Sequence, residues 1–96
     1  MKSKQVISLI KKHRPELTKF GVKSVALFGS VARGEAKESS DVDILVEFEG
    51  RATFDGFMDT KYYLEEILGC RVDLVMPDAI KPRMKPAIMQ DLVYVS

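Results

Sequence analysis

Two aspartates, Asp41 and Asp43, stand at the start of an alternating apolar stretch that runs from Val42 to Phe48. A hydrophobic period of two predicts a β-strand, with both carboxylates on the same face and about 7 Å apart along the backbone. A charge inside an apolar strand is costly unless it is paired or bound to a cation. The stretch therefore predicts a strand at whose start the two aspartates serve a function and do not belong to the core.

The rest of the chain alternates between helical and strand patterns, with glycine or proline at most boundaries. One amphipathic helix is expected over residues 6–17, where Pro15 predicts a break or a restart. Thr53 and Gly69 are typical of the two caps of a second helix. The expected strands are residues 23–28, 42–48 and 71–76, with a helical turn at 31–33, a loop over 34–40, and a short helix and an edge strand in the tail after residue 79.

Length and charge narrow the class of protein. With 96 residues, the chain is expected to form one domain, residues 1–96. No apolar run approaches the roughly 20 residues of a membrane-spanning helix, and the N-terminal segment is too polar for a signal peptide, so we expect a cytoplasmic protein without membrane contact. The net charge of +1 argues against a protein that coats polyanions. Direct nucleic-acid binding is disfavoured too, because the basic N-terminal helix lacks aromatic residues for base stacking.

The residue types also limit the metals that this chain can bind. Cys70 is the single cysteine and His13 the single histidine. An intrachain disulfide framework and a multi-cysteine zinc site are therefore excluded. Carboxylate oxygens remain as ligands, and they suit hard ions such as Mg²⁺ or Mn²⁺.

Further candidate residues lie in two other apolar strands. Asp73 stands between Val72 and Leu74, where it could face the same way as the first two aspartates and complete a site for one or two Mg²⁺ ions. Each of these acids alone is typical of a loop end or a solvated strand margin. Their joint placement among three apolar strands favours a metal site.

A glycine and a serine directly follow the strand at residues 23–28. Gly29 lets backbone N–H groups approach an anion without a side chain in the way, and Ser30 begins a helical turn. Arg33, one turn later, could pair with phosphate oxygens, and Lys37 is a weaker candidate in the loop. Taken alone, a Gly-Ser pair is typical of an ordinary tight turn. Here the pair follows one apolar strand and precedes the strand that carries the two aspartates, and this order favours a phosphate site.

These motifs resemble the signature of the DNA polymerase beta nucleotidyltransferase superfamily, and in particular its minimal nucleotidyltransferases from bacteria and archaea. The resemblance rests on LFGSVARG at 27–34, on ten residues between Ser30 and Asp41, on SDVDILV at 40–46 and on RVDLV at 71–75. It implies an α+β fold, with a small mixed β-sheet and helices packed on one side. It also implies transfer of a nucleoside monophosphate, AMP from ATP, to a hydroxyl acceptor.

The same resemblance implies roles for individual residues. Asp41 and Asp43 would bind metal, Asp73 would help to activate the acceptor and contribute to the metal site, and Gly29 and Ser30 would hold the triphosphate. Many such proteins act as antitoxins of a HEPN-type ribonuclease toxin, some by adenylylating a tyrosine of the toxin. A HEPN toxin is therefore the implied partner.

The residues themselves leave other functions open. A domain this small has little surface to enclose both a nucleobase and an acceptor, so a partner protein or a second copy is expected to supply the acceptor or the missing wall. The chain could instead be a non-catalytic module that binds nucleotide or metal and masks a partner. It could also be a metal-dependent phosphohydrolase, because the same ions could activate water.

Overall fold

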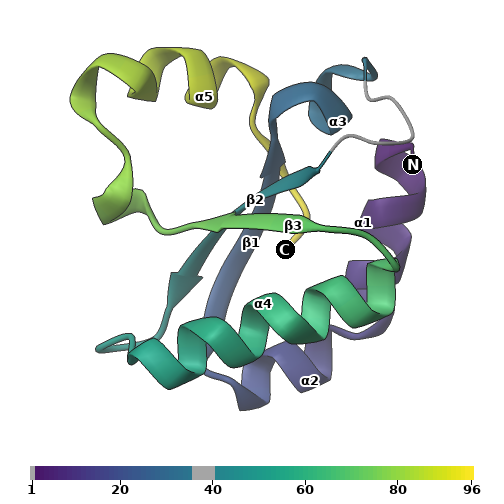
Figure 1. The fold of residues 1–96 in the computed structure, drawn as a ribbon, viewed down its shortest axis with the longest axis vertical. Helices are drawn as coiled ribbons and strands as arrows, with labels where there is room; N and C mark the ends of the chain where they lie inside the picture. Colours follow the sequence, from purple (N-terminus) through teal and green to yellow (C-terminus); the bar gives the residue numbers. More distant parts are fainter. Residues whose placement is uncertain (1, 36–40) are drawn as a thin grey trace.

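The computed structural model describes residues 2–35 and 41–96 as a four-stranded mixed β-sheet with helices on it (Figure 1). The strand order is β3-β2-β1-β4, in which β1 is antiparallel to β2 and β4, and β2 is parallel to β3. This arrangement confirms the predicted fold class. The elements are α1 (Ser3–Lys12), α2 (Arg14–Lys19), β1 (Val22–Phe28), α3 (Gly29–Arg33), β2 (Val42–Phe48), α4 (Phe54–Leu68), β3 (Val72–Val75), the 3-10 turns η1 (Pro77–Ala79) and η2 (Pro82–Met84), α5 (Lys85–Asp91) and β4 (Val93–Tyr94).

The helix boundaries follow from local chemistry. The predicted first helix is two helices, and Pro15 lies in the first turn of the second, where its missing N–H costs nothing. The Thr53 side chain accepts a hydrogen bond from the Gly56 N–H at 3.0 Å, which caps α4 as predicted. Gly69 ends α4 with a φ of +68°, a conformation that favours glycine.

Helices cover the two faces of the sheet to different extents. Side chains from α1, α2 and α4 pack on one face and form the core, and they include Val6, Leu17 and Leu64. Figure 1 shows α5 on the opposite side of the strands from α4, so the second face is only partly covered. The expectation of helices on one side omitted this short C-terminal cover, because its residues carry no long amphipathic pattern. No helix in the described ranges has the length and apolar character needed to cross a membrane.

Candidate active site

A glycine brings the chain close to Asp43. Gly29 directly follows β1 and has a φ of +74°, and a Cβ atom placed on it would lie 2.1 Å from Asp43 Oδ2. No side chain larger than hydrogen fits this space without moving the carboxylate. The glycine therefore both makes the turn into α3 and leaves room for Asp43. The predicted approach of its backbone to a phosphate stays a prediction.

The register of the sheet brings the second and third aspartates together. Phe28 of β1 is the partner of Asp43 in β2, and Asp43 is in turn the partner of Asp73 in β3. Directly paired residues point to the same face, so these three side chains form a row across the partly covered face of the sheet. The sequence predicted that Asp73 could face the same way, and the parallel register confirms it.

Burial and neighbouring charged groups change the pKa of Asp43. Partial burial, followed by the charge of Asp73 and its hydrogen bond, and then the charge of Asp41, raises the pKa of Asp43 to about 6. The Arg33 guanidinium acts in the opposite direction and lowers that pKa. Asp41, Asp73 and Arg33 are thus all close enough to influence Asp43, so the predicted residues share one electrostatic environment.

The aspartates do not by themselves form a closed metal centre. Among residues 2–35 and 41–96, no three His, Cys, Asp or Glu side chains are grouped so that they could hold a metal ion. The donors nevertheless suit Mg²⁺, which binds through one or two carboxylates and takes its other ligands from water and substrate phosphates. Metal binding by Asp41, Asp43 and Asp73 therefore stays a prediction. It requires oxygen atoms of water or of substrate phosphates to complete the coordination of the ion.

Arg33, the predicted phosphate ligand, is engaged with carboxylates. Its Nη1 atom donates to Asp91 Oδ2 of α5 at 2.7 Å, and its Nε atom donates to Glu35 at 3.2 Å. The hydrogen bond to Asp91 is the main cause that raises the pKa of Arg33. Arg33 would therefore have to exchange these partners to reach a phosphate. Lys37 and Ser40, which were also part of the predicted motif, lie outside the described residues.

One residue that holds the start of β3 has no signal in the sequence. Glu65 of α4 accepts a hydrogen bond from the Val72 N–H at 3.1 Å through its Oε2 atom. Val72 is buried and directly precedes Asp73. Glu65 therefore helps to hold the strand that carries the third aspartate, and only the spatial proximity of α4 and β3 reveals this.

Replacing Glu65 by Ala is expected to lower the free energy of unfolding by about 1–2 kcal/mol, because it leaves the Val72 N–H without its charged acceptor. Urea denaturation measures the loss. The matched control is Glu66→Ala, which makes the same change at the next, exposed position of α4. Equal losses in the two variants would contradict the role of Glu65.

Several hollows lie on the surface, and two of them lie on the partly covered face of the sheet. One, of about 220 Å³, is lined by Phe28, Asp73 and Val75 on the sheet and by residues of the segment from Ala79 to Ile88. The other, of about 280 Å³, lies over Leu45 and Glu47. The sequence predicts a short helix and an edge strand after residue 79, but it carries no signal that residues 79–88 lie beside Asp73.

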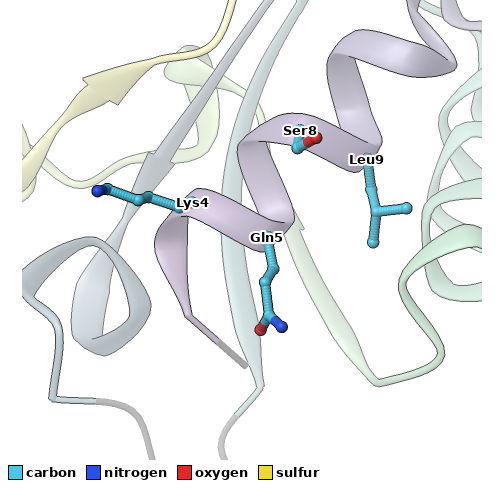
Figure 2. Close-up of a pocket in the computed structure, with 4 residues that line it drawn as sticks. All are labelled: Lys4, Gln5, Ser8 and Leu9. Carbon is cyan, nitrogen blue, oxygen red and sulfur yellow. The ribbon is translucent and has the colours of Figure 1, made fainter.

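A different hollow, of about 450 Å³, lies on α1 and is lined by Lys4, Gln5, Ser8 and Leu9. Figure 2 shows that the four side chains all come from this one helix and do not converge on a common point. This hollow contains none of the predicted site residues. We therefore place the candidate active site at the aspartates of β2 and β3.

Comparisons with known proteins found a family and relatives that match most of the chain. Residues 9–95 match the family described as nucleotidyltransferase domain. Protein adenylyltransferase MntA of Thermococcus cleftensis is 45% identical over 92 residues, which cover 95% of this chain and 93% of the relative. A solved structure with a provisional assignment as a minimal nucleotidyltransferase has a TM-score of 0.83 and 34% identity, and the match covers 97% of this chain and 95% of that chain.

A solved complex gives a more distant likeness. It is described as a tri-AMPylated Shewanella oneidensis HEPN toxin in complex with MNT antitoxin, and a chain of it matches with a TM-score of 0.66 and 17% identity. The match covers 94% of this chain and 71% of that chain. At this identity the likeness shows a shared fold.

Proposed function

Because this chain belongs to the nucleotidyltransferase domain family, we propose that it is a Mg²⁺-dependent protein adenylyltransferase that moves AMP from ATP to a tyrosine of a HEPN toxin. The observation that carries the proposal is the row of Asp43 and Asp73, with Gly29 against the first of them. The 45% identity to a protein adenylyltransferase supports AMP as the transferred group and a protein as the acceptor.

Each predicted residue has a role in this proposal. Asp41 and Asp43 would hold Mg²⁺, and two ions are expected, with Asp73 nearby as a further carboxylate. Bound Mg²⁺ would neutralise the triphosphate and polarise the α-phosphate. Gly29 and Ser30, at the start of α3, would lie against the triphosphate. Arg33 would turn from Asp91 to a phosphate oxygen.

The proposed reaction is an in-line displacement at the α-phosphorus of ATP. The acceptor oxygen forms a bond to this phosphorus while the bond from the phosphorus to the α,β-bridging oxygen breaks. Pyrophosphate leaves with the electron pair of the broken bond, and the hydroxyl proton passes to the carboxylate of Asp73 or through it to water. Asp73 is exposed, so an acceptor from outside the chain can reach it.

The HEPN toxin is proposed as partner because of the solved complex of an AMPylated HEPN toxin with an MNT antitoxin. Modification of the toxin would make this chain an antitoxin. ATP is supplied inside the cell, which also favours the cytoplasmic location expected from the sequence. A single domain over residues 1–96 would suffice for the nucleotide site, while the partner supplies the acceptor.

Replacing Asp91 by Asn is expected to raise the affinity for the ATP analogue AMP-PNP about two- to fivefold, because Arg33 then loses a charged competitor of the triphosphate. Isothermal titration calorimetry with Mg²⁺ measures this. Asp59→Asn removes an exposed acid from α4 and is the control for net charge. A lower affinity in Asp91→Asn alone would mean instead that Asp91 holds Arg33 in its phosphate-binding position.

Transfer of label from ATP tests the function directly. The protein is incubated with Mg²⁺, proteins of a source-cell lysate and ATP labelled at the α-phosphate, with γ-labelled ATP as the control. We expect α-label on a tyrosine of one protein, identified by mass spectrometry, and none with Asp41→Asn/Asp43→Asn. Free AMP without a labelled acceptor would favour the phosphohydrolase. Mg²⁺-dependent ATP binding without any turnover would favour the non-catalytic masking module.

A further inference from the structure

The outer side of α4 carries apolar side chains. The buried residues of this helix face the core, and the opposite side of such a helix is ordinarily polar. Here Phe54 is 77% and Tyr62 is 59% exposed, and Met58 between them is half-buried. Isolated apolar residues are common on protein surfaces, but a continuous apolar patch typically marks a surface that contacts another molecule.

These three side chains form a ridge along the helix. Phe54, Met58 and Tyr62 are spaced four residues apart, and side chains at this spacing make up one of the rows that interdigitate when two helices pack. At a rise of about 1.5 Å per residue, the ridge extends about 12 Å along α4. Its shape and length therefore fit the groove of a second helix, which would contact the ridge over about two turns.

Acidic side chains follow one edge of this ridge. Asp55, Asp59 and Glu66 are all exposed, and at about 100° of rotation per residue they lie within about 40° of one another around the helix axis. In residues 2–35 and 41–96, none of these three acids takes part in an ion pair. Lys61 lies on the opposite edge of the ridge. The acid edge favours a partner that brings positive charge to it.

The charges also decide which occupant fits this ridge. Two copies of α4 packed antiparallel about a two-fold axis would bring their acid edges together, so that Asp55 and Asp59 of one copy repel those of the other. Parallel packing would offer Lys61 alone to the three acids of the second copy. The same acids repel a nucleic acid or an anionic membrane surface. A basic helix of a different protein matches both the ridge and its acid edge.

We propose that the ridge of Phe54, Met58 and Tyr62 is a docking surface for an amphipathic helix of a partner protein, with lysine or arginine beside the apolar residues of that helix. Figure 1 shows α4 and α5 on opposite sides of the strands, and the row of aspartates faces the α5 side. A partner docked on α4 therefore leaves Asp43 and Asp73 open to substrates. The inference is independent of the proposed function, because it involves no residue of the candidate active site.

Two synthetic peptides of opposite charge test the docking surface. Both form the same helix with a ridge of leucines, and they carry either lysine or glutamate beside it. The full chain, with ¹³C-labelled methionine methyl groups, is titrated with each peptide and followed by NMR. We expect the lysine peptide to shift the Met58 signal, with a Kd about tenfold or more below that of the glutamate peptide. The signals of Met84 and Met89, which are 50% and 54% exposed on the other side of the sheet, are expected to stay in place.

Matched variants separate the ridge from its acid edge. Phe54→Gln and Tyr62→Gln are each expected to weaken binding of the lysine peptide by about tenfold. Met89→Gln removes a similarly exposed apolar side chain from the other side of the sheet and is expected to leave the affinity unchanged. Asp55→Asn/Asp59→Asn is expected to reduce the preference for the lysine peptide over the glutamate peptide. All these side chains are exposed, so each variant should fold, which thermal denaturation checks.

Several results would overturn the docking surface. Equal affinity for the two peptides, or shifts at Met84 and Met89 as large as that at Met58, would show general adhesion of apolar peptides. Self-association in sedimentation equilibrium that Phe54→Gln abolishes would show that a second copy occupies the ridge. No nucleotide takes part in these experiments, so this inference and the proposed function can fail separately.

Discussion

Asp43→Asn is expected to abolish AMP transfer and at the same time to stabilise the ligand-free protein at neutral pH. The substitution removes a carboxylate that is predicted to bind Mg²⁺, and the rate of transfer should fall by about a thousandfold or more. It also removes a partly buried negative charge that Asp73 and Asp41 repel. Burial of the charge and this repulsion both contribute to the gain in the free energy of unfolding, which is expected to be about 1 kcal/mol because solvent screens part of the effect.

The raised pKa of Asp43 determines how the free energy of unfolding changes with pH. The pKa of Asp43 is raised from 3.8 to about 6 in the folded protein, so the folded state binds this proton more tightly than the unfolded state. The contribution of Asp43 to stability is therefore fully present below about pH 4 and is lost as the pH rises through about 6. Asp43→Asn should remove this loss. Urea denaturation between pH 4 and pH 7 measures both proteins.

The exposed acid Asp59 of α4 offers a control, because Asp59→Asn changes the net charge equally and lies outside the row of aspartates. We expect it to alter neither transfer nor the pH dependence attributed to Asp43. If Asp43→Asn kept wild-type turnover with Mg²⁺ present, the metal role of this carboxylate would be wrong. If it destabilised the protein at pH 7, burial and repulsion of the Asp43 charge would not be the dominant effects of this carboxylate on stability.

Gly29→Ala is expected to destabilise the protein by about 2 kcal/mol and to abolish transfer. Part of the cost arises from the φ of +74°, which an L-residue adopts with strain. The remaining cost arises from the new methyl group, which would lie 2.1 Å from Asp43 Oδ2 and must displace the carboxylate. Thermal denaturation and the α-label assay measure the two effects.

Gly34 separates the two causes. It has a φ of +76°, close to that of Gly29, but no atom lies within 4 Å of the position that its Cβ would take. Gly34→Ala is therefore expected to cost only about 1 kcal/mol and to retain transfer. Similar behaviour of the two variants would show that backbone strain, and not contact with Asp43, explains the need for glycine at position 29.

Local patterns predicted most of the elements because each has a cause within a few residues. The alternation from Val42 to Phe48 gave the exact bounds of β2, since its apolar face has to meet the core. Thr53 and Gly69 marked the ends of α4, since both act on backbone groups of their own turn. The strand predicted at residues 71–76 is shorter, Val72–Val75, because strand ends depend on their pairing partners.

The partners of the site residues could not be predicted in the same way. Asp91 lies 58 residues from Arg33 in the sequence, and Glu65 reaches Val72 across the packing of α4 on β3. Neither contact has a local pattern, since each depends on the docking of one element against another. The wall of the hollow beside Asp73 has the same origin, because Ile80 and Ile88 meet the sheet only through the path of the chain after β3.

The sequence by itself determined which residues are candidates for the chemistry. Gly29, Ser30, Asp41 and Asp43 follow one another at a spacing that local backbone geometry turns into a strand, a turn and a second strand. Only the tertiary structure decided how these residues are combined. The parallel register that places Asp73 beside Asp43, and the raised pKa that results, are products of long-range strand pairing and burial. Such pairing joins segments that are distant in the sequence, so it depends on the assembled sheet and not on any local pattern.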